Sequence, residues 1–66
     1  RMKIIVNGRP AELNATSLDL ALVELGFTNP AIATAVNGAF VAATSRTGTV
    51  LSENDRIEVL LPMKGG

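Results

Sequence analysis

Two short segments near the start of the chain flank an Asn-Gly pair. Residues 2–6 read MKIIV, residues 9–13 read RPAEL, and Asn7 and Gly8 lie between them. A two-residue hairpin turn needs positive φ at both of its positions, and Asn and Gly tolerate this conformation best. The pattern therefore predicts two antiparallel strands joined by a tight turn.

A helical spacing of apolar residues follows this hairpin. The apolar positions are Leu18, Ala21, Leu22 and Leu25. Spacings of three, four and seven residues place them on one face of a helix. The hydroxyl of Thr16 or Ser17 is expected to cap the first turn, and Gly26 is expected to end the helix in the left-handed conformation. We expect a short amphipathic helix that lies across a sheet.

A second Asn-Gly pair divides the next apolar stretch. Residues 32–36 read IATAV and predict a third strand, and Asn37-Gly38 joins it to a brief fourth strand around Phe40 and Val41. The following residues, 42–49, are small and polar, so we expect a loop there.

The last third of the chain predicts one more strand. Val50 and Leu51 are expected to return to the core, and residues 52–55 are expected to form a turn in which Asn54 adopts the left-handed conformation. Residues 56–61 read RIEVLL and predict the last strand.

This order of elements predicts an α+β fold. A hairpin, a helix, two further strands and a last strand form a mixed four- to five-stranded sheet with one main helix packed on one face, which is the arrangement of a β-grasp domain. A right-handed crossover through the helix would set the last strand parallel to the first in the middle of the sheet. Residues 1–61 are expected to form this domain and residues 62–66 a flexible tail.

Alternation along the strands predicts which side chains face the helix. Successive side chains of a strand point to opposite faces of the sheet. The expected inward residues are Met2, Ile4, Val6, Ile57, Val59 and Leu61. On the other face Ile5, Ala35 and Leu60 are apolar, and together they would form a patch of the kind that marks a protein interface. Single exposed aliphatic residues are also common on small proteins, so a plain surface is the alternative.

Composition narrows the class of partner. The chain has 66 residues, six basic and six acidic side chains scattered along it, and 47% hydrophobic residues. These values fit one small folded domain, and no basic cluster suited to nucleic acid is present. Phe27 and Phe40 are the only aromatic residues, and both are expected to fill the core. No apolar run is long enough to span a membrane, so a cytoplasmic protein is expected.

The absence of two residue types excludes much enzyme chemistry. The chain contains neither cysteine nor histidine. Disulfides, thiol nucleophiles, imidazole bases and the usual zinc sites are therefore excluded. No cofactor or metal is expected to bind this chain, and a stand-alone enzyme is the weakest interpretation.

The end of the chain carries the candidate chemistry. The tail is Pro62, Met63, Lys64, Gly65 and Gly66. Five extended residues reach about 16 Å, and a glycine pair without Cβ atoms can thread a narrow channel. Pro62 would stop the strand, and Lys64 would meet acidic groups of a partner. The carboxylate of Gly66 is then the expected working group, although a frayed chain end is the plain alternative.

A carboxylate must be activated before it reacts. Attack on the α-phosphate of ATP would give an acyl-adenylate at Gly66, and a sulfur nucleophile could then displace AMP to leave a thiocarboxylate. This step needs Mg²⁺, cationic groups and a nucleotide pocket, which this chain lacks. ATP and Mg²⁺ would be used by a partner adenylating enzyme.

Several segments together resemble the ThiS family, the ubiquitin-like sulfur carrier proteins of thiamine biosynthesis. The resemblance covers residues 2–66 and is carried by IIVNG at 4–8, AVNG at 35–38 followed by Phe40-Val41, NDRIEV at 54–59 and LPMKGG at 61–66. Asn54 stands where relatives often have glycine, a departure that a left-handed Asn accommodates.

The resemblance implies a set of partners. It implies that a ubiquitin-activating-like adenylyltransferase (ThiF-like) adenylates Gly66, that a sulfur donor such as a cysteine desulfurase supplies sulfur, and that a thiazole synthase (ThiG-like) uses the resulting thiocarboxylate.

Two other interpretations stay open. The small subunit of molybdopterin synthase is also ubiquitin-like and also ends in a Gly-Gly thiocarboxylate, and a passive β-grasp interaction module would have no chemistry at its tail. A third, weaker interpretation is an acid–base enzyme. Its candidate carboxylates are Asp19, Glu24, Glu53, Asp55 and Glu58, which are expected instead to form a solvated surface.

Overall fold

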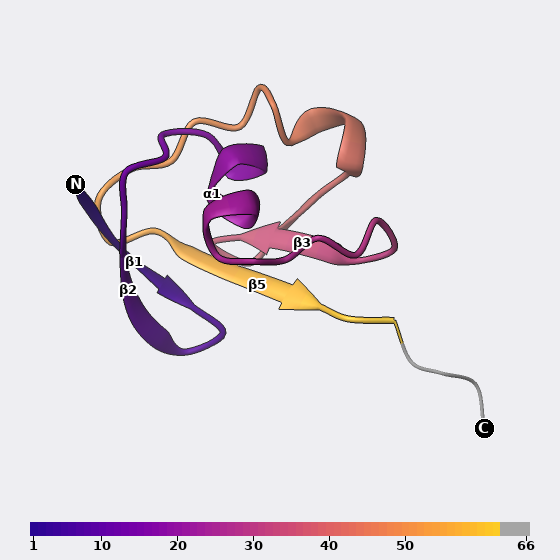
Figure 1. Ribbon diagram of the computed structural model, residues 1–66, viewed down its shortest axis with the longest axis horizontal. Helices are drawn as coiled ribbons and strands as arrows, with labels where there is room; N and C mark the ends of the chain where they lie inside the picture. The colour runs from indigo at the N-terminus through magenta and orange to yellow at the C-terminus, as the bar shows by residue number, and fades with distance from the viewer. Residues whose placement is uncertain (63–66) are drawn as a thin grey trace.

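The computed structural model describes residues 1–62, in which a five-stranded sheet carries a helix on one face (Figure 1). In chain order the elements are β1 Met2–Val6, β2 Arg9–Leu13, α1 Leu18–Glu24, β3 Ala33–Val36, β4 Ala39–Val41, the 3-10 turn η1 Ala43–Ser45 and β5 Arg56–Leu60. The predicted α+β architecture is confirmed, and η1 is an addition within the stretch expected to be a loop.

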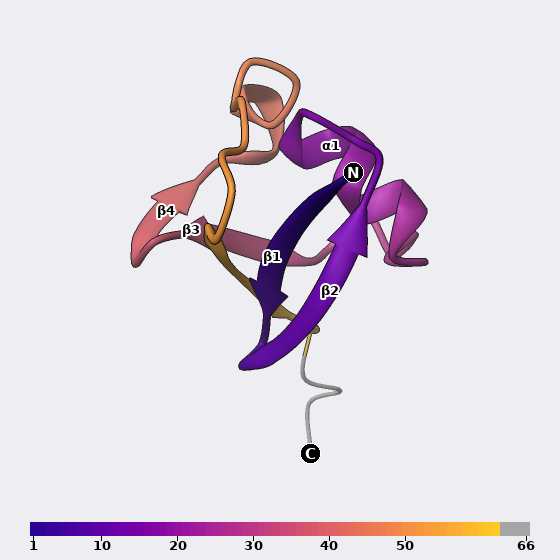
Figure 2. The ribbon, with the colours of Figure 1, turned by 90° about the vertical axis from the view of Figure 1, so that its left-hand side faces the viewer.

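The middle of the sheet is a parallel pair. The strand order is β2-β1-β5-β3-β4. β1 and β5 run parallel, with Val6 beside Ile57, whereas the pairs β1–β2, β5–β3 and β3–β4 are antiparallel. Figure 2 shows α1 on one face of this sheet. The predicted parallel pairing of the first and last strands is confirmed.

The core lies between the helix and the inner face of the sheet. Ile4, Leu18 and Ile57 are fully buried at its centre. The other buried apolar residues are Val6, Leu13, Ala21, Leu22, Ile32, Leu51 and Val59. Alternate strand residues therefore point inward as predicted, because burying them against the helix removes the largest apolar area from water.

Both ends of α1 are closed by backbone groups. At the C-terminal end Gly26 has φ of +85°, and the N–H groups of Gly26 and Phe27 donate to the carbonyls of Val23 and Leu22, which is a Schellman motif. At the other end Ser17 occupies the cap position, but its hydroxyl donates to Asp19 Oδ1 at 2.6 Å. The predicted hydroxyl cap is therefore wrong in its bonding. The Leu18 N–H donates to the Thr49 carbonyl instead, at 2.9 Å.

The two Asn-Gly turns form as predicted and also hold β5. Asn7 and Asn37 have φ of 48° and 51°. The amide of Asn7 accepts from the Val59 N–H at 2.8 Å and donates to the Val59 carbonyl at 3.2 Å. The amide of Asn37 accepts from the Arg56 N–H at 2.9 Å. Each turn therefore supplies β5 with side-chain bonds in addition to the strand ladders.

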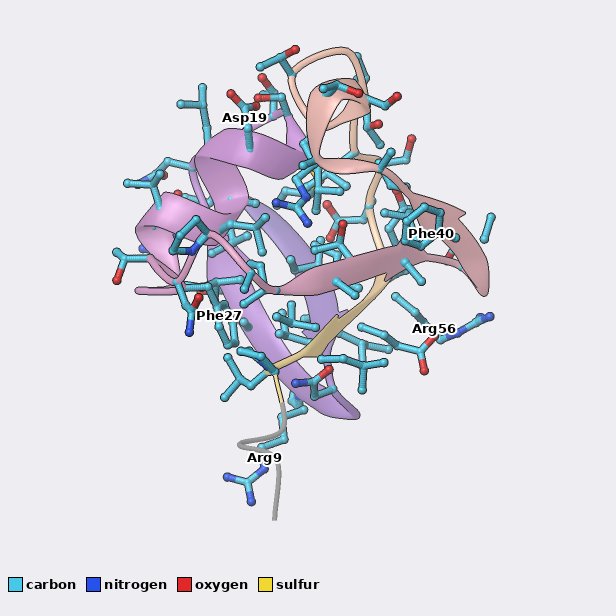
Figure 3. All side chains as sticks on the ribbon, turned by 90° about the vertical axis from the view of Figure 1, so that its right-hand side faces the viewer. Arg9, Asp19, Phe27, Phe40 and Arg56 are labelled. Carbon is cyan, nitrogen blue, oxygen red and sulfur yellow. The ribbon has the colours of Figure 1, made fainter. Side chains whose placement is uncertain are left out.

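The two phenylalanines have different environments. Phe27 packs against the core, whereas Phe40 is 74% exposed on the face away from the helix. Figure 3 shows them well apart, with Phe27 beside the helix and Phe40 at the β3–β4 pair. The prediction that Phe40 fills the core is wrong because Phe40 lies directly opposite Ala35, an outward residue of β3.

Two further predictions of inward side chains are wrong. Val50 is 75% exposed, because it pairs with Ser17 in an extended segment in which the next residue, Leu51, takes the inward position. Leu61 is 60% exposed, because β5 ends at Leu60, where its pairing with β3 also ends, and no strand flanks the next residue.

A buried polar cluster fixes the segment after β4. Thr34 is 2% exposed, donates to the Val41 carbonyl at 2.8 Å and accepts from Arg46 Nε at 2.9 Å. Arg46 Nη2 also donates to the Ile32 carbonyl at 2.8 Å. Within residues 1–62 every buried side-chain polar atom has a hydrogen-bond partner. The Thr34 hydroxyl is thus accommodated in the core without an unsatisfied group.

Replacing Asn7 by glycine tests the bond to β5. Asn7→Gly keeps the positive φ of the turn but removes both bonds to Val59, so we expect the free energy of unfolding to fall by about 1–3 kcal/mol. Urea unfolding measures it. The matched control is Asn54→Gly. Asn54 also has positive φ, but within residues 1–62 its side chain makes no hydrogen bond, so this substitution should change stability by less than about 0.5 kcal/mol. Equal losses in both variants would contradict the role given to the Asn7 amide.

The phenylalanines provide a second test. Phe27→Ala is expected to lower the free energy of unfolding by about 1–3 kcal/mol, because it removes a ring packed on the core. Phe40→Ala should change it by less than about 0.5 kcal/mol, since the ring is mostly in water. Thermal and urea unfolding of the two variants give the comparison, and a larger loss for Phe40→Ala would show that its ring is buried.

Candidate functional site

The predicted tail begins immediately after the central strand. β5 ends at Leu60, and Leu61 and Pro62 are exposed beyond it, at the edge of the described molecule in Figure 1. Proline has no backbone N–H to continue a ladder, which suits the end of β5. Met63, Lys64, Gly65 and Gly66 lie outside the described residues, so the roles predicted for them stay predictions.

The face of the sheet away from the helix carries a hollow next to this tail. We call it the outer-face hollow. It has a volume of about 190 Å³ and is lined mainly by Ala33, Ala35, Phe40, Glu58 and Leu60. The Phe40 ring and the methyl groups come from three strands in register, since Ala35 lies opposite both Phe40 and Glu58, and Ala33 lies opposite Leu60. Leu60 is 70% exposed and, like Phe40, offers a large apolar side chain to a partner.

Of the three residues predicted to form an interface, two line the outer-face hollow and one does not. Ala35 and Leu60 both line the outer-face hollow. Ile5 lies on the same face but outside the hollow, half-buried between Pro10 on β2 and Arg56 on β5. Two of the three predicted residues therefore line one hollow, the third lies on the same face outside it, and their role as an interface stays a prediction.

Sequence reasoning missed Phe40 as a surface residue of this hollow. The signal was present, because residues at equal distances from a two-residue turn lie opposite each other and share a face. Ala35 and Phe40 are equally far from Asn37-Gly38. Once Ala35 was placed on the outer face, Phe40 had to be placed there too.

The hollow has one carboxylate on its lining. Glu58 is exposed. The one ion pair among residues 1–62 joins Arg1 to Glu12 at 2.8 Å, at the opposite edge of the sheet from β4. An apolar floor beside a carboxylate that has no ion-pair partner within this part of the chain suits a partner that presents an apolar side chain and a basic group. Such a complementary pair of charges favours the correct orientation of a partner more than it adds affinity.

The other candidate carboxylates bind nearby groups of the chain. Glu24 accepts from the N–H groups of Asn14 and Ala15 at 3.0–3.1 Å and so ties the β2–α1 connection to the helix. Asp55 accepts from the Ser52 N–H at 2.7 Å and shapes the turn before β5. These contacts organise the backbone. Among residues 1–62 no group of three acidic, histidine or cysteine side chains is arranged to hold a metal ion.

The helix of the described chain is far too short to cross a bilayer. α1 spans seven residues, and none of the helical structure within residues 1–62 meets the length and apolarity that a membrane span requires.

A family model matches nearly the whole chain. It describes the ThiS family and matches residues 4–66, which include the Gly-Gly end. No curated protein matches the chain.

Solved structures of the same fold exist. The crystal structure of a thiamine biosynthesis protein, ThiS, from Geobacter metallireducens superposes with a TM-score of 0.84 at 23% identity, over 98% of this chain and 100% of that one. The solution structure of a thiamine biosynthesis protein from the same organism gives a TM-score of 0.78 at 23% identity, over 98% of this chain and 88% of that one. At this identity the likeness establishes the fold, which is the ubiquitin-like β-grasp that the sequence predicted.

Proposed function

This chain belongs to the ThiS family, and from that membership we propose that it is a sulfur carrier of thiamine biosynthesis and not itself an enzyme. The single observation that carries the proposal is that the family match extends through Gly66, so the family pattern includes the Gly-Gly end and not only the fold. A second support is the composition, since a chain without cysteine or histidine has neither a thiol nucleophile nor an imidazole base.

The proposed reaction takes place at the carboxylate of Gly66. One carboxylate oxygen attacks the α-phosphate of ATP and pyrophosphate leaves, which gives an acyl-adenylate. Hydrosulfide can then attack the acyl carbon, and AMP leaves, which gives a thiocarboxylate directly. When the nucleophile is instead an enzyme-bound persulfide, AMP leaves to give an acyl disulfide, and a thiol reductant then cleaves its S–S bond to release the thiocarboxylate. ATP and Mg²⁺ are bound by a ubiquitin-activating-like adenylyltransferase, where cationic groups stabilise the charge on the phosphates. A sulfur donor such as a cysteine desulfurase supplies the sulfur, and a thiazole synthase consumes it.

The body of the protein positions this terminus for its partners. The outer-face hollow includes Leu60, which is six residues before Gly66. At about 3.3 Å per extended residue, the terminal carboxylate lies within about 20 Å of Leu60. A partner that binds the hollow can therefore reach it. Gly65 has no Cβ, so the last residues can enter a narrow channel that a side chain would block. Docking and chemistry are thus placed on two linked but separate parts of the chain.

The first test of this proposal follows the mass of the protein. After incubation with ATP, Mg²⁺, an adenylyltransferase of this class and a sulfur donor, intact mass spectrometry should show the increase that corresponds to exchange of one oxygen for sulfur. Deletion of Gly66 should abolish the increase, whereas Val23→Ala, an exposed substitution on α1, should leave it unchanged. An equal gain in the deletion variant would exclude Gly66 as the site, and no gain in the complete chain would favour a passive interaction module.

The consumer of the sulfur is identified by transfer. The thiocarboxylate form is incubated with thiazole synthase or with the large subunit of molybdopterin synthase, and loss of the sulfur mass is followed. We expect the sulfur mass to be lost with thiazole synthase and kept with the molybdopterin synthase subunit. Loss only with the molybdopterin synthase subunit would assign the chain to that pathway instead.

A further test separates docking from chemistry. Leu60→Glu places a charge at the apolar hollow beside Glu58, so we expect kcat/KM for thiocarboxylate formation to fall about tenfold or more while the fold is retained. Val50→Glu is the matched control, because Val50 is as exposed as Leu60 but lies outside the hollow. Equal effects of the two substitutions on kcat/KM would show that the hollow is not the docking surface.

A further inference from the structure

The two edges of the sheet differ in how they are protected. The outer strand β2 carries Arg9, Pro10 and Glu12, whereas the opposite outer strand β4 reads Ala39, Phe40, Val41. Proteins protect open edges against pairing with other chains by placing charges and proline on them. β2 has both of these devices and β4 has neither, so β4 is the edge at which another strand can add.

The backbone of Phe40 faces this open edge. The Asn37 N–H donates to the Arg56 carbonyl of β5 at 2.8 Å. Backbone groups alternate in direction along a strand, so the groups of Val36 point toward β4 and those of Ala35 toward β5. Phe40 lies opposite Ala35, and its N–H and carbonyl therefore point away from β3. One residue presents both a donor and an acceptor, and its ring is exposed as well.

We propose that β4 pairs in an antiparallel manner with β4 of a second copy of this chain, about a two-fold axis at Phe40. A two-fold axis requires the same patch on both copies to be self-complementary. Phe40 meets this requirement, because each N–H donates to the other carbonyl. The two rings then lie opposite each other on the outer face, as an aromatic cross-strand pair, and the two outer-face hollows adjoin.

Charge does not oppose this pairing. The formal net charge of the chain is zero, and β4 itself has no charged residue. The carboxylate lining the hollow, on Glu58, lies two strands in from the edge. With strands about 4.8 Å apart, the two Glu58 positions would be roughly 24 Å apart, well beyond the Debye length of about 8 Å at physiological ionic strength.

The expected association is weak. β4 has three residues and offers one outward pair of backbone groups, so the interface belongs to the small and transient class. The pairing would engage the Phe40 ring, which lines the outer-face hollow, and would therefore compete with a partner that contacts this ring. It does not depend on the proposed function, because it is measured on the isolated protein without ATP or partner enzymes.

Sedimentation equilibrium over a range up to about 1 mM chain tests the proposal. We expect the weight-average mass of the wild type to rise above that of the monomer as concentration increases. Phe40→Lys places a charge at the axis and should weaken association at least tenfold. Val50→Lys, an equally exposed apolar position outside β4, should behave as the wild type. A wild type that is monomeric at about 1 mM, or an equal effect of Val50→Lys, would overturn the proposal.

A second measurement uses the unmodified protein. Amide chemical shifts recorded on dilution should change most at Phe40 and its neighbours in β4. Changes centred on α1 or on β2 would show association through another surface and would also overturn the proposal.

Discussion

The structure depends on how β5 is held in the middle of the sheet. β1 turns away after Val6, and its register with β5 contains only two residue pairs, the last of them Val6 with Ile57. The side-chain amide of Asn7 continues the ladder by binding both backbone groups of Val59. A planar amide has the same donor and acceptor as a peptide group, so it can replace the missing strand residue. β5 is therefore fixed nearly to its end.

This constraint sets where the tail starts and how it can be used. Val59 is buried and bonded on the β1 side, and Leu60 pairs with Ala33 on the other. The first residue after the ladder is Leu61. In the proposed function a partner enzyme must hold the body and reach the terminal carboxylate, and a fixed origin for the tail limits the volume in which that carboxylate is found. Such a limit raises its effective concentration at the partner's active site.

Local chemistry was enough to predict most of the fold, and longer-range pairing explains the rest. The two Asn-Gly turns, the helical spacing from Leu18 and the left-handed Gly26 are local signals, and the structure confirms them. The environment of Val50 depended on its pairing with Ser17, more than thirty residues earlier in the chain. The cap of α1 likewise depended on carbonyls of the 46–49 segment, which no local rule places beside the helix.

The candidate site also combines a part that local sequence indicates with a part that depends on long-range pairing. Its tail rests on the sequence alone, because glycine and proline at a chain end have direct physical meanings, and beyond Pro62 it stays a prediction. The outer-face hollow could not be predicted in this way, because it needs the sheet order that sets β3 between β5 and β4 and the register that places Ala35 between Glu58 and Phe40. The alternation of side chains places Ile5 on the same face as Leu60, but Ile5 lies beside Arg56, outside the hollow.

The short length of β4, an uncharged edge strand with an exposed apolar side chain, places an upper limit on the strength of pairing at this edge. A longer β4 with the same composition would offer more outward backbone groups, and would bring a risk of irreversible edge-to-edge association. β4 is only three residues long, and the chain leaves the strand at Ala42, where the Ala42 carbonyl accepts from the Ser45 N–H of η1 at 2.9 Å. The turn η1 therefore ends the open edge just after Phe40. A surface that must bind a partner and then release it is better served by one exposed residue than by a full strand, because each additional pair of backbone bonds would slow dissociation.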